Sequence, residues 1–384
     1  AEQLAQALSQ QPKNAETRSQ LATALQKLGR RDEALKVLSG GLALSENTPA
    51  LLQQRVRLLL ELRQPDDARE TVERLLFLAP DDVTSHTLAS VVFENNGELL
   101  AASDHAEKAV ACDDTSADAW RALAQVRIRQ ERLSEAAHAL RTVLTLDPNN
   151  TSDTYRQLGW ICINESRNED AIVTFTAAVE NNANDASSWY GLAQAHQIVG
   201  NFAEALAAIN TALKLRNGWL DALVLRGNIL IAQGPDTWND AVSQLSDALS
   251  LQPERTETRC LLSMALQRLD RRDESLQVLA DGLRIVPEAS DLLRLQTSSL
   301  LDLGRTENAH MACRRLSRQQ PQEGIGWCLL AMVFEQNKRP GMALRALARA
   351  RRCAPALPDA WLRTGWLALG KGDTRTAREA VTRL

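Results

Sequence analysis

Histidine and cysteine are the side chains of this sequence best suited to bind a metal or to act as a catalytic base or nucleophile. Its 5 histidines and 6 cysteines are scattered along 384 residues. No two histidines have the spacing of a His-Glu-x-x-His zinc motif, and no two cysteines form a Cys-x-x-Cys pair. No Gly-x-Ser-x-Gly, Gly-x-Gly-x-x-Gly or phosphate-binding loop is present either. The sequence therefore predicts a protein that is not an enzyme and uses no metal or other cofactor.

The cysteine pattern also bears on the cellular compartment. The spacing fits neither a zinc site nor a disulfide framework, and Cys162 and Cys313 fall at positions that we assign to the core. We interpret the cysteines as reduced packing residues, which is typical of a cytoplasmic protein. No run of 18 apolar residues occurs, so a membrane span is not expected.

Composition favours helices packed on helices. Hydrophobic residues make up 44% of the chain and aromatic residues only 4%, and alanine and leucine dominate. No β-rich segment argues against an all-α fold. The formal net charge is −4.

Residues 117–150 contain the pattern around which the rest of the chain is organised. Apolar residues at helical spacing, including Trp120 and Ala124, are followed by a short polar turn. A second helical stripe begins with Ala136, and Pro148 ends it because proline has no amide hydrogen to donate. This pattern predicts one helical hairpin, which cannot bury both of its faces unless it is repeated.

The hairpin resembles the tetratricopeptide repeat, a unit of about 34 residues. The residues that carry the resemblance, at repeat positions 4, 7, 8, 20, 24 and 32, are Trp120, Leu123, Ala124, Ala136, Leu140 and Pro148. Small residues at positions 8 and 20 let the two helices approach closely. The resemblance implies an all-α fold, specifically a right-handed superhelical α-solenoid of tandem hairpins.

The unit recurs along nearly the whole sequence. We expect residues 1–14 to be the tail of a truncated repeat, residues 15–255 to hold repeats 1 to 7, and residues 256–384 to hold repeats 8 to 11, the last one truncated. The predicted first residues of these repeats are Ala15, Pro49, Val83, Ala117, Ser152, Ala186, Leu220, Thr256, Ser290, Gly324 and Pro358. Both ends of the chain would then fall inside a repeat and expose apolar surface, which favours end-to-end or homo-oligomeric contacts.

A longer period is superimposed on the repeats. Residues 16–42 and 257–283 are identical at 17 of 27 positions, at an offset of 241 residues. We interpret the second block as a partial copy of the first, produced by duplication within the gene. The alternative is that both blocks independently follow the consensus of the family.

The resemblance also indicates where a ligand would bind. In this family the first helix of each repeat lines a concave groove, and its positions 2, 5, 9 and 12 face that groove. In repeats 4 to 7 these positions include Arg121, Gln125, Arg156, Trp160, Tyr190, Gln194 and Asn228. Guanidinium and amide groups suit the carboxylates and main chain of an extended peptide, and Trp160 and Tyr190 offer flat apolar anchors. The alternative is that these are ordinary solvated groove residues.

Basic residues gather near the end of the sequence. Residues 305–384 hold 15 Lys/Arg against 6 Asp/Glu. Positions 26 and 29 of the second helices carry a basic stripe, which comprises Arg315, Arg318, Arg349 and Arg352. The stripe is either a solvated face or a contact for an acidic partner or for another part of the same protein. Nucleic acid is not expected, because no aromatic residues alternate with these arginines.

These observations predict a non-catalytic protein-interaction scaffold that binds a peptide segment or partner protein in the concave groove. The alternative is the recognition or regulatory arm of a larger enzyme, such as a glycosyl- or sulfotransferase, or of a secretion or export assembly. The sequence leaves both possibilities open.

Overall fold

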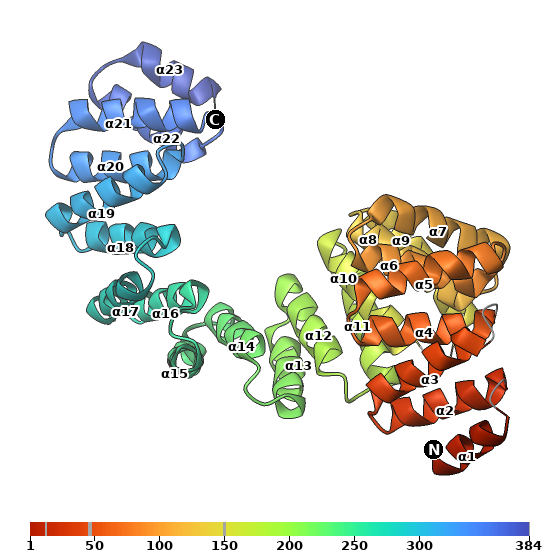
Figure 1. Cartoon of the computed structure of the whole chain (residues 1–384). Coiled ribbons are helices and arrows are strands. Elements are labelled where there is room, and N and C mark those ends of the chain that lie inside the picture. Colours follow the sequence, from red (N-terminus) through yellow and green to blue (C-terminus); the bar gives the residue numbers. More distant parts are fainter. Residues whose placement is uncertain (12–13, 45–47, 149–150, 384) are drawn as a thin grey trace. The chain divides into compact units, whose positions relative to one another are not determined.

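The computed structural model describes residues 1–11, 14–44, 48–148 and 151–383. Over these residues the secondary structure is helical, with no strand (Figure 1). The prediction of an all-α fold is therefore confirmed. None of the helices in this part of the chain has the length and apolar character needed to cross a membrane. The chain forms two compact units, an N-terminal unit of Ala1–Gly191 and a C-terminal unit of Leu192–Leu384.

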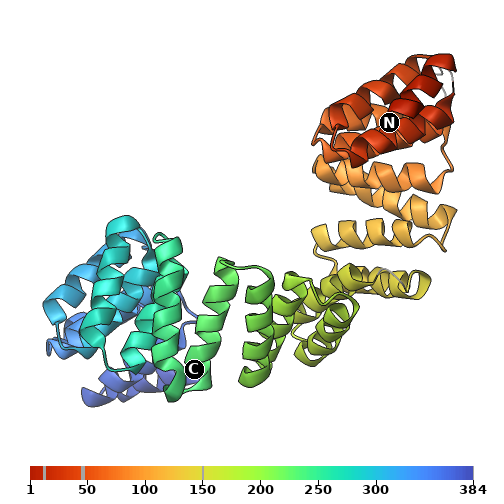
Figure 2. The same ribbon diagram turned by 90° about the horizontal axis from the view of Figure 1, so that it is seen from below.

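The N-terminal unit consists of a single helix, α1 (Glu2–Gln10), followed by five helical hairpins. Within the unit the hairpins are stacked one after another (Figure 2). Their helices are α2 (Ala15–Lys27), α3 (Arg31–Leu44), α4 (Pro49–Glu61), α5 (Pro65–Leu78), α6 (Val83–Asn95), α7 (Leu99–Cys112), α8 (Ala117–Arg129), α9 (Leu133–Leu146), α10 (Ser152–Asn164) and α11 (Asn168–Asn181). Helix α12 (Ala186–Val199) contains the boundary between the units.

The C-terminal unit continues the same pattern. A short 3-10 turn, η1 (Pro235–Thr237), accommodates extra residues in one hairpin turn. The helices are α13 (Phe202–Leu215), α14 (Leu220–Gln233), α15 (Trp238–Leu251), α16 (Thr256–Arg268), α17 (Arg272–Ile285), α18 (Ser290–Asp302), α19 (Thr306–Gln319), α20 (Gly324–Gln336), α21 (Pro340–Cys353), α22 (Pro358–Gly370) and α23 (Thr374–Thr382). The first helix of every hairpin in both units begins at the residue predicted to open its repeat.

Local chemistry sets the ends of these helices. Helix α8 begins where the Ser116 hydroxyl accepts a hydrogen bond from the Ala119 amide. The turn after α8 has Glu131 in the left-handed region, with φ of 60°, and the Arg132 amide donates to the Arg127 carbonyl. The corresponding residue of every hairpin turn has positive φ. One left-handed residue per hairpin thus reverses the chain.

Small residues allow the two helices of a hairpin to cross closely. Ala124 in α8 and Ala136 in α9 are both fully buried and belong to one apolar cluster with Leu140. The expectation that repeat positions 8 and 20 lie at the crossing agrees with this burial. Close packing of this kind leaves little room for a larger side chain.

The next hairpin uses glycine at its crossing because it buries a large ring there. Phe175 in α11 is fully buried. A Cβ atom added to Gly159 in α10 would come within 2.7 Å of the Phe175 ring, and one added to Gly191 in α12 would also clash with it. The ring therefore occupies the space that alanine side chains would fill elsewhere in the stack.

We predict that Gly159→Ala destabilises the protein. Inside a helix this substitution usually raises stability by about 0.5–1 kcal/mol, but here overpacking against Phe175 should lower the free energy of unfolding by roughly 1–3 kcal/mol. Urea unfolding followed by circular dichroism measures the difference. Combining the change with Phe175→Leu should recover part of the loss, because the two residues are in contact.

Gly341→Ala is the matched control. Gly341 lies in α21, and a Cβ atom added to it would meet nothing within 4 Å. This variant should be as stable as the parent or slightly more so. Equal stability of the Gly159 and Gly341 variants would show that the ring does not limit the space at the crossing.

A buried arginine recurs at the offset of 241 residues. Arg18 and Arg259 are 9% and 6% exposed. Each donates from Nη1 to a valine carbonyl 3.1 Å away, Val37 in the first case and Val278 in the second. A duplication requires such equivalent contacts, although the grouping of the repeats into two copies stays a prediction.

The stacking gives each unit an inner and an outer side. Helices α2, α4, α6 and α8 contact one another in series, and so do α14, α16, α18, α20 and α22. Over the described residues, no comparable series of contacts joins the second helices. The first helices therefore line the inner side of each unit, and the second helices lie on its outer side.

Candidate functional site

The inner side of the N-terminal unit contains a cavity of about 380 Å³, which we call the inner cavity. Helices α4, α6, α8 and α10, the first helices of four successive hairpins, contribute most of its lining. Leu88, Ala122 and Leu140 supply apolar surface. The polar lining residues are Arg57, Thr84, Thr87, Ser116, Asp118, Arg121, Gln125, Asp153, Thr154 and Gln157. Two of the predicted groove residues, Arg121 and Gln125, are among them.

The predicted arginines are already paired with carboxylates of the same chain. Arg121 forms an ion pair with Asp118 at 2.7 Å and a second with Asp147. Arg156 pairs with Asp153 and, at 3.6 Å, with Asp185. A carboxylate of a bound peptide would have to compete with these partners. Both arginines are therefore poorer anion anchors than the sequence suggested.

Arg57 is the cation of the inner cavity that sequence reasoning missed. It lies at position 9 of repeat 2, is exposed, and has no ion-pair partner among the described residues. Gln125 and Trp160 occupy the same position of repeats 4 and 5. The repeat pattern alone therefore places Arg57 on the groove side, although the predicted groove residues lie only in repeats 4 to 7.

Gln125 is hydrogen-bonded to the nearly buried carboxylate of Glu94. Its amide nitrogen donates to Glu94 Oε1 at 3.4 Å, and Arg129 forms an ion pair with the same oxygen. Glu94 is only 8% exposed. Gln125 is thereby oriented by its own chain, with its carbonyl oxygen left to accept a hydrogen bond from a ligand.

Trp160 and Tyr190 form an aromatic cluster outside the inner cavity. The Trp160 ring packs edge-on against the buried Phe175 ring, with centroids 5.3 Å apart, and lies 6.1 Å from the Tyr190 ring. The expectation that Trp160 faces the groove and not the hairpin core is therefore only half right. Trp160 is half-buried because Gly159 and Gly191 let Phe175 reach the inner side.

We predict that Trp160→Ala costs about 2 kcal/mol of stability, because it removes ring contacts with Phe175 and leaves a partial cavity. The urea midpoint measures the loss. Trp366→Ala is the control, since Trp366 holds the same position of repeat 11 but is 70% exposed. That control should shift stability by less than about 0.5 kcal/mol. If the two variants lose the same amount of stability, the contact between Trp160 and Phe175 does not stabilise the fold.

The remaining predicted groove residues lie in the C-terminal unit. Gln194 in α12 and Asn228 in α14 are both half-buried. Neither lines a cavity found in the described part of that unit. Of the seven predicted residues, two thus line the inner cavity, two form the aromatic cluster and two lie in a separate unit, while Arg156 belongs to none of these groups.

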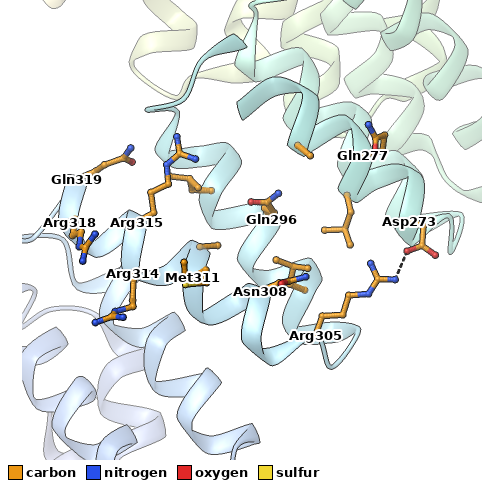
Figure 3. Close-up of a pocket in the computed structure, with 15 residues that line it drawn as sticks. Asp273, Gln277, Gln296, Arg305, Asn308, Met311, Arg314, Arg315, Arg318 and Gln319 are labelled. Atoms are coloured by element: carbon orange, nitrogen blue, oxygen red, sulfur yellow. Dashed lines mark hydrogen bonds and ion pairs between the residues drawn. The ribbon is translucent and has the colours of Figure 1, made fainter. Parts of the chain in front are cut away.

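The basic stripe lies on second helices, as predicted. Arg315 and Arg318 are in α19 and line a cavity of about 900 Å³ on the outer side of the C-terminal unit (Figure 3). Arg349 and Arg352 are in α21 and are exposed. The Arg349 guanidinium carbon lies 4.9 Å from the centre of the Trp327 ring.

Two histidines from different helices meet in the N-terminal unit, which their spacing did not indicate. His86 Nε2 lies 2.7 Å from the Pro80 carbonyl, which can only accept, so Nε2 carries the proton. His86 Nδ1 therefore accepts from His105 Nδ1, 3.0 Å away. Among the described residues, no group of three or more His, Cys, Asp or Glu could hold a metal ion.

We predict that this pair makes stability fall as pH falls. Burial lowers the pKa of His105. The neighbouring His86 and Lys108 lower this pKa further, whereas Asp104 raises it. Below about pH 6.5, the unfolded chain takes up a proton that the folded chain binds less readily, so the free energy of unfolding decreases. The stability that the neutral pair contributes is therefore fully present above about pH 6.5 and is lost as the pH falls below that value.

The measurement is the urea midpoint of the parent chain and of His105→Gln between about pH 7.5 and pH 5. Glutamine can still donate to His86 but does not titrate. The parent should lose more stability over this range. His196, whose pKa burial also lowers, is present in both proteins and cancels. Parallel curves for the two proteins would contradict the assignment.

Burial also keeps several cysteines unreactive. Cys162 and Cys313 are buried free thiols, as expected for packing residues. Burial raises the pKa of Cys313 to about 12 and those of Cys260 and Cys328 to about 11. These thiols remain protonated near neutral pH and are poor nucleophiles.

Comparison with known families agrees with this architecture. Models described as tetratricopeptide repeat match residues 1–53, 54–117, 117–150, 163–222 and 294–358. Together they cover more than half of the chain. The protein therefore belongs to the tetratricopeptide repeat family.

Solved structures show the same fold. Yeast Tom70 is 15% identical with a TM-score of 0.52, and the match covers 97% of this chain and 91% of that one. A tetratricopeptide repeat protein from Parabacteroides merdae is also 15% identical with a TM-score of 0.52, over 62% of this chain and 93% of that one. Pseudomonas aeruginosa pilF is 18% identical with a TM-score of 0.50, over 55% and 95%. Among curated proteins, none matches the chain.

Proposed function

We propose that this protein is a non-catalytic interaction scaffold whose inner cavity binds an extended peptide segment of a partner protein. Membership in the tetratricopeptide repeat family supports the general role of a protein-interaction scaffold. The observation that carries the specific proposal is the inner cavity itself. It runs across the first helices of four hairpins and combines an apolar floor with polar walls.

The lining suits a peptide main chain. Thr84, Gln125 and Gln157 present donors and acceptors along the cavity. Leu88 and Val91 offer apolar surface to one side chain of the peptide. Because Arg57 has no ion-pair partner among the described residues, it is the group best placed to bind a carboxylate, from an acidic side chain or from the end of a chain.

The test begins with a peptide library displayed on phage and selected against the parent protein. The enriched peptides are then measured against Arg57→Glu and Val91→Glu. Each change should weaken binding by about tenfold or more, because it adds a negative charge to the cavity and removes a favourable contact. Arg57→Glu should abolish the preference for acidic peptides.

Arg141→Glu is the matched control. Arg141 is an exposed residue of α9, a second helix of the same unit, and its reversal changes the net charge as much as Arg57→Glu does. Binding to this variant should be unchanged, and all three variants should keep the helicity of the parent. Peptides that bind every variant alike would place their site outside the inner cavity.

A further inference from the structure

The C-terminal unit carries a second hollow surface, which is independent of the inner cavity. The cavity of about 900 Å³ lies between α17 and α19, with α18 beneath them. Because α17 and α19 are second helices, it opens on the outer side of this unit; Figure 3 shows the residues that line it. Its floor includes Leu276, Leu293 and Leu300, all at least nine-tenths buried, and Met311 beside them is 67% exposed. We call this surface the outer groove.

The two ends of the outer groove differ in charge. At one end Arg305 forms an ion pair with Asp273 at 2.7 Å, as the dashed line in Figure 3 shows. At the other end lie Arg314, Arg315 and Arg318 (Figure 3). Asp273 is the single acidic residue in the lining. Negative charge within the groove is therefore confined to the end where it is already neutralised.

The three clustered arginines keep their charge available. Arg314 and Arg318 are exposed and have no hydrogen-bond or ion-pair partner among the described residues. Arg315 donates one hydrogen bond to the Pro287 carbonyl, which does not neutralise it. Three guanidinium groups on adjacent turns of one helix repel one another unless anions lie between them.

A second hollow extends the basic surface. This one has a volume of about 470 Å³, lies against α19, α20 and α21, and shares Arg314 and Arg318 with the outer groove. Arg339 and Met342 lie on its far side. The Ser317 hydroxyl in its lining is nearly buried and has no hydrogen-bond partner within the described chain. The paired hollows thus combine cations with apolar side chains.

The aromatic residues nearby are unsuited to stacking against bases. Arg349 covers the Trp327 ring, with its guanidinium carbon 4.9 Å from the ring centre. Phe334 packs against His310, with ring centroids 5.7 Å apart. Proteins that bind single-stranded nucleic acid present open aromatic faces beside their basic residues. The leucine and methionine floor is better matched to an apolar side chain.

We propose that the outer groove binds a short acidic segment of a partner protein. An apolar side chain of that segment lies on Leu276, Leu293 and Leu300, and carboxylates next to it along the segment pair with Arg314 and Arg318 at the basic end of the groove. The charge complementarity is specific, because the unpaired cations stand directly beside the apolar floor. Exposed Met311 adapts its flexible side chain to the bound residue.

The test uses a fluorescein-labelled peptide of about 12 residues in which glutamate pairs alternate with leucine pairs. Anisotropy should show saturable binding to the full chain that weakens with added salt. The double variant Arg314→Glu/Arg318→Glu should weaken binding by at least about tenfold. Met311→Glu should also weaken it, because it places a charge at the edge of the apolar floor.

The control is Arg375→Glu/Arg378→Glu, which changes the net charge equally at exposed positions of α23. It should bind as the parent does, and so should Arg57→Glu, whose site is the inner cavity. All variants are checked for helicity by circular dichroism. Lack of binding by the parent, or equal losses in the two double variants, would overturn the proposal.

Two further probes separate apolar docking from general attraction of anions. One is the same peptide with alanine in place of leucine, and the other is a single-stranded oligonucleotide of equal charge. Both should bind at least about tenfold more weakly than the leucine peptide. If the alanine peptide binds equally well, the floor plays no part. If the oligonucleotide binds equally well, the surface selects phosphates, and the assignment to a protein segment is wrong.

Discussion

The close approach of helices at positions without bulky side chains is the constraint on which this solenoid depends. Ala124 and Ala136 fill one crossing with two methyl groups. In the next hairpin, Gly159 has no side chain at the crossing, Gly191 on the following helix α12 has none either, and the Phe175 ring fills the space. The second solution brings the core to the inner side and thereby draws Trp160 into the packing.

The sequence predicted the fold well because the repeat pattern is local. Each hairpin needs helical spacing of apolar residues, a short polar turn and small residues at its crossing, and all of these can be counted along the chain. The aromatic cluster could not be predicted in the same way. It depends on Phe175 crossing from a second helix to meet Trp160, which in turn lies beside Tyr190, and the Phe175 contact is determined by the missing side chains of two glycines in α10 and α12.

The candidate site was predictable only in part, for a related reason. The three-residue spacing of Asp118 and Arg121 could have been read as an ion pair within one helix, but the pairing of Arg121 with Asp147 required the folded hairpin. Likewise, His86 and His105 are 19 residues apart and meet only through their helices. Arg315 and Arg318 of the outer groove were visible as part of the basic stripe, whereas Arg314 was not, and the apolar floor is assembled from three helices.

The placement of acidic residues decides which arginines of the solenoid keep their charge available. On the inner side of the N-terminal unit, Arg121 pairs with Asp147, just after the second helix of its own hairpin, and Arg156 pairs with Asp185, just before the next hairpin. On the outer side of the C-terminal unit, Arg305 likewise pairs with Asp273 of the preceding second helix. Among the described residues, the groove lining holds no acidic residue besides Asp273, so Arg314 and Arg318 at the opposite end stay unpaired. That end therefore carries uncompensated charge beside apolar surface, the combination that an acidic partner requires.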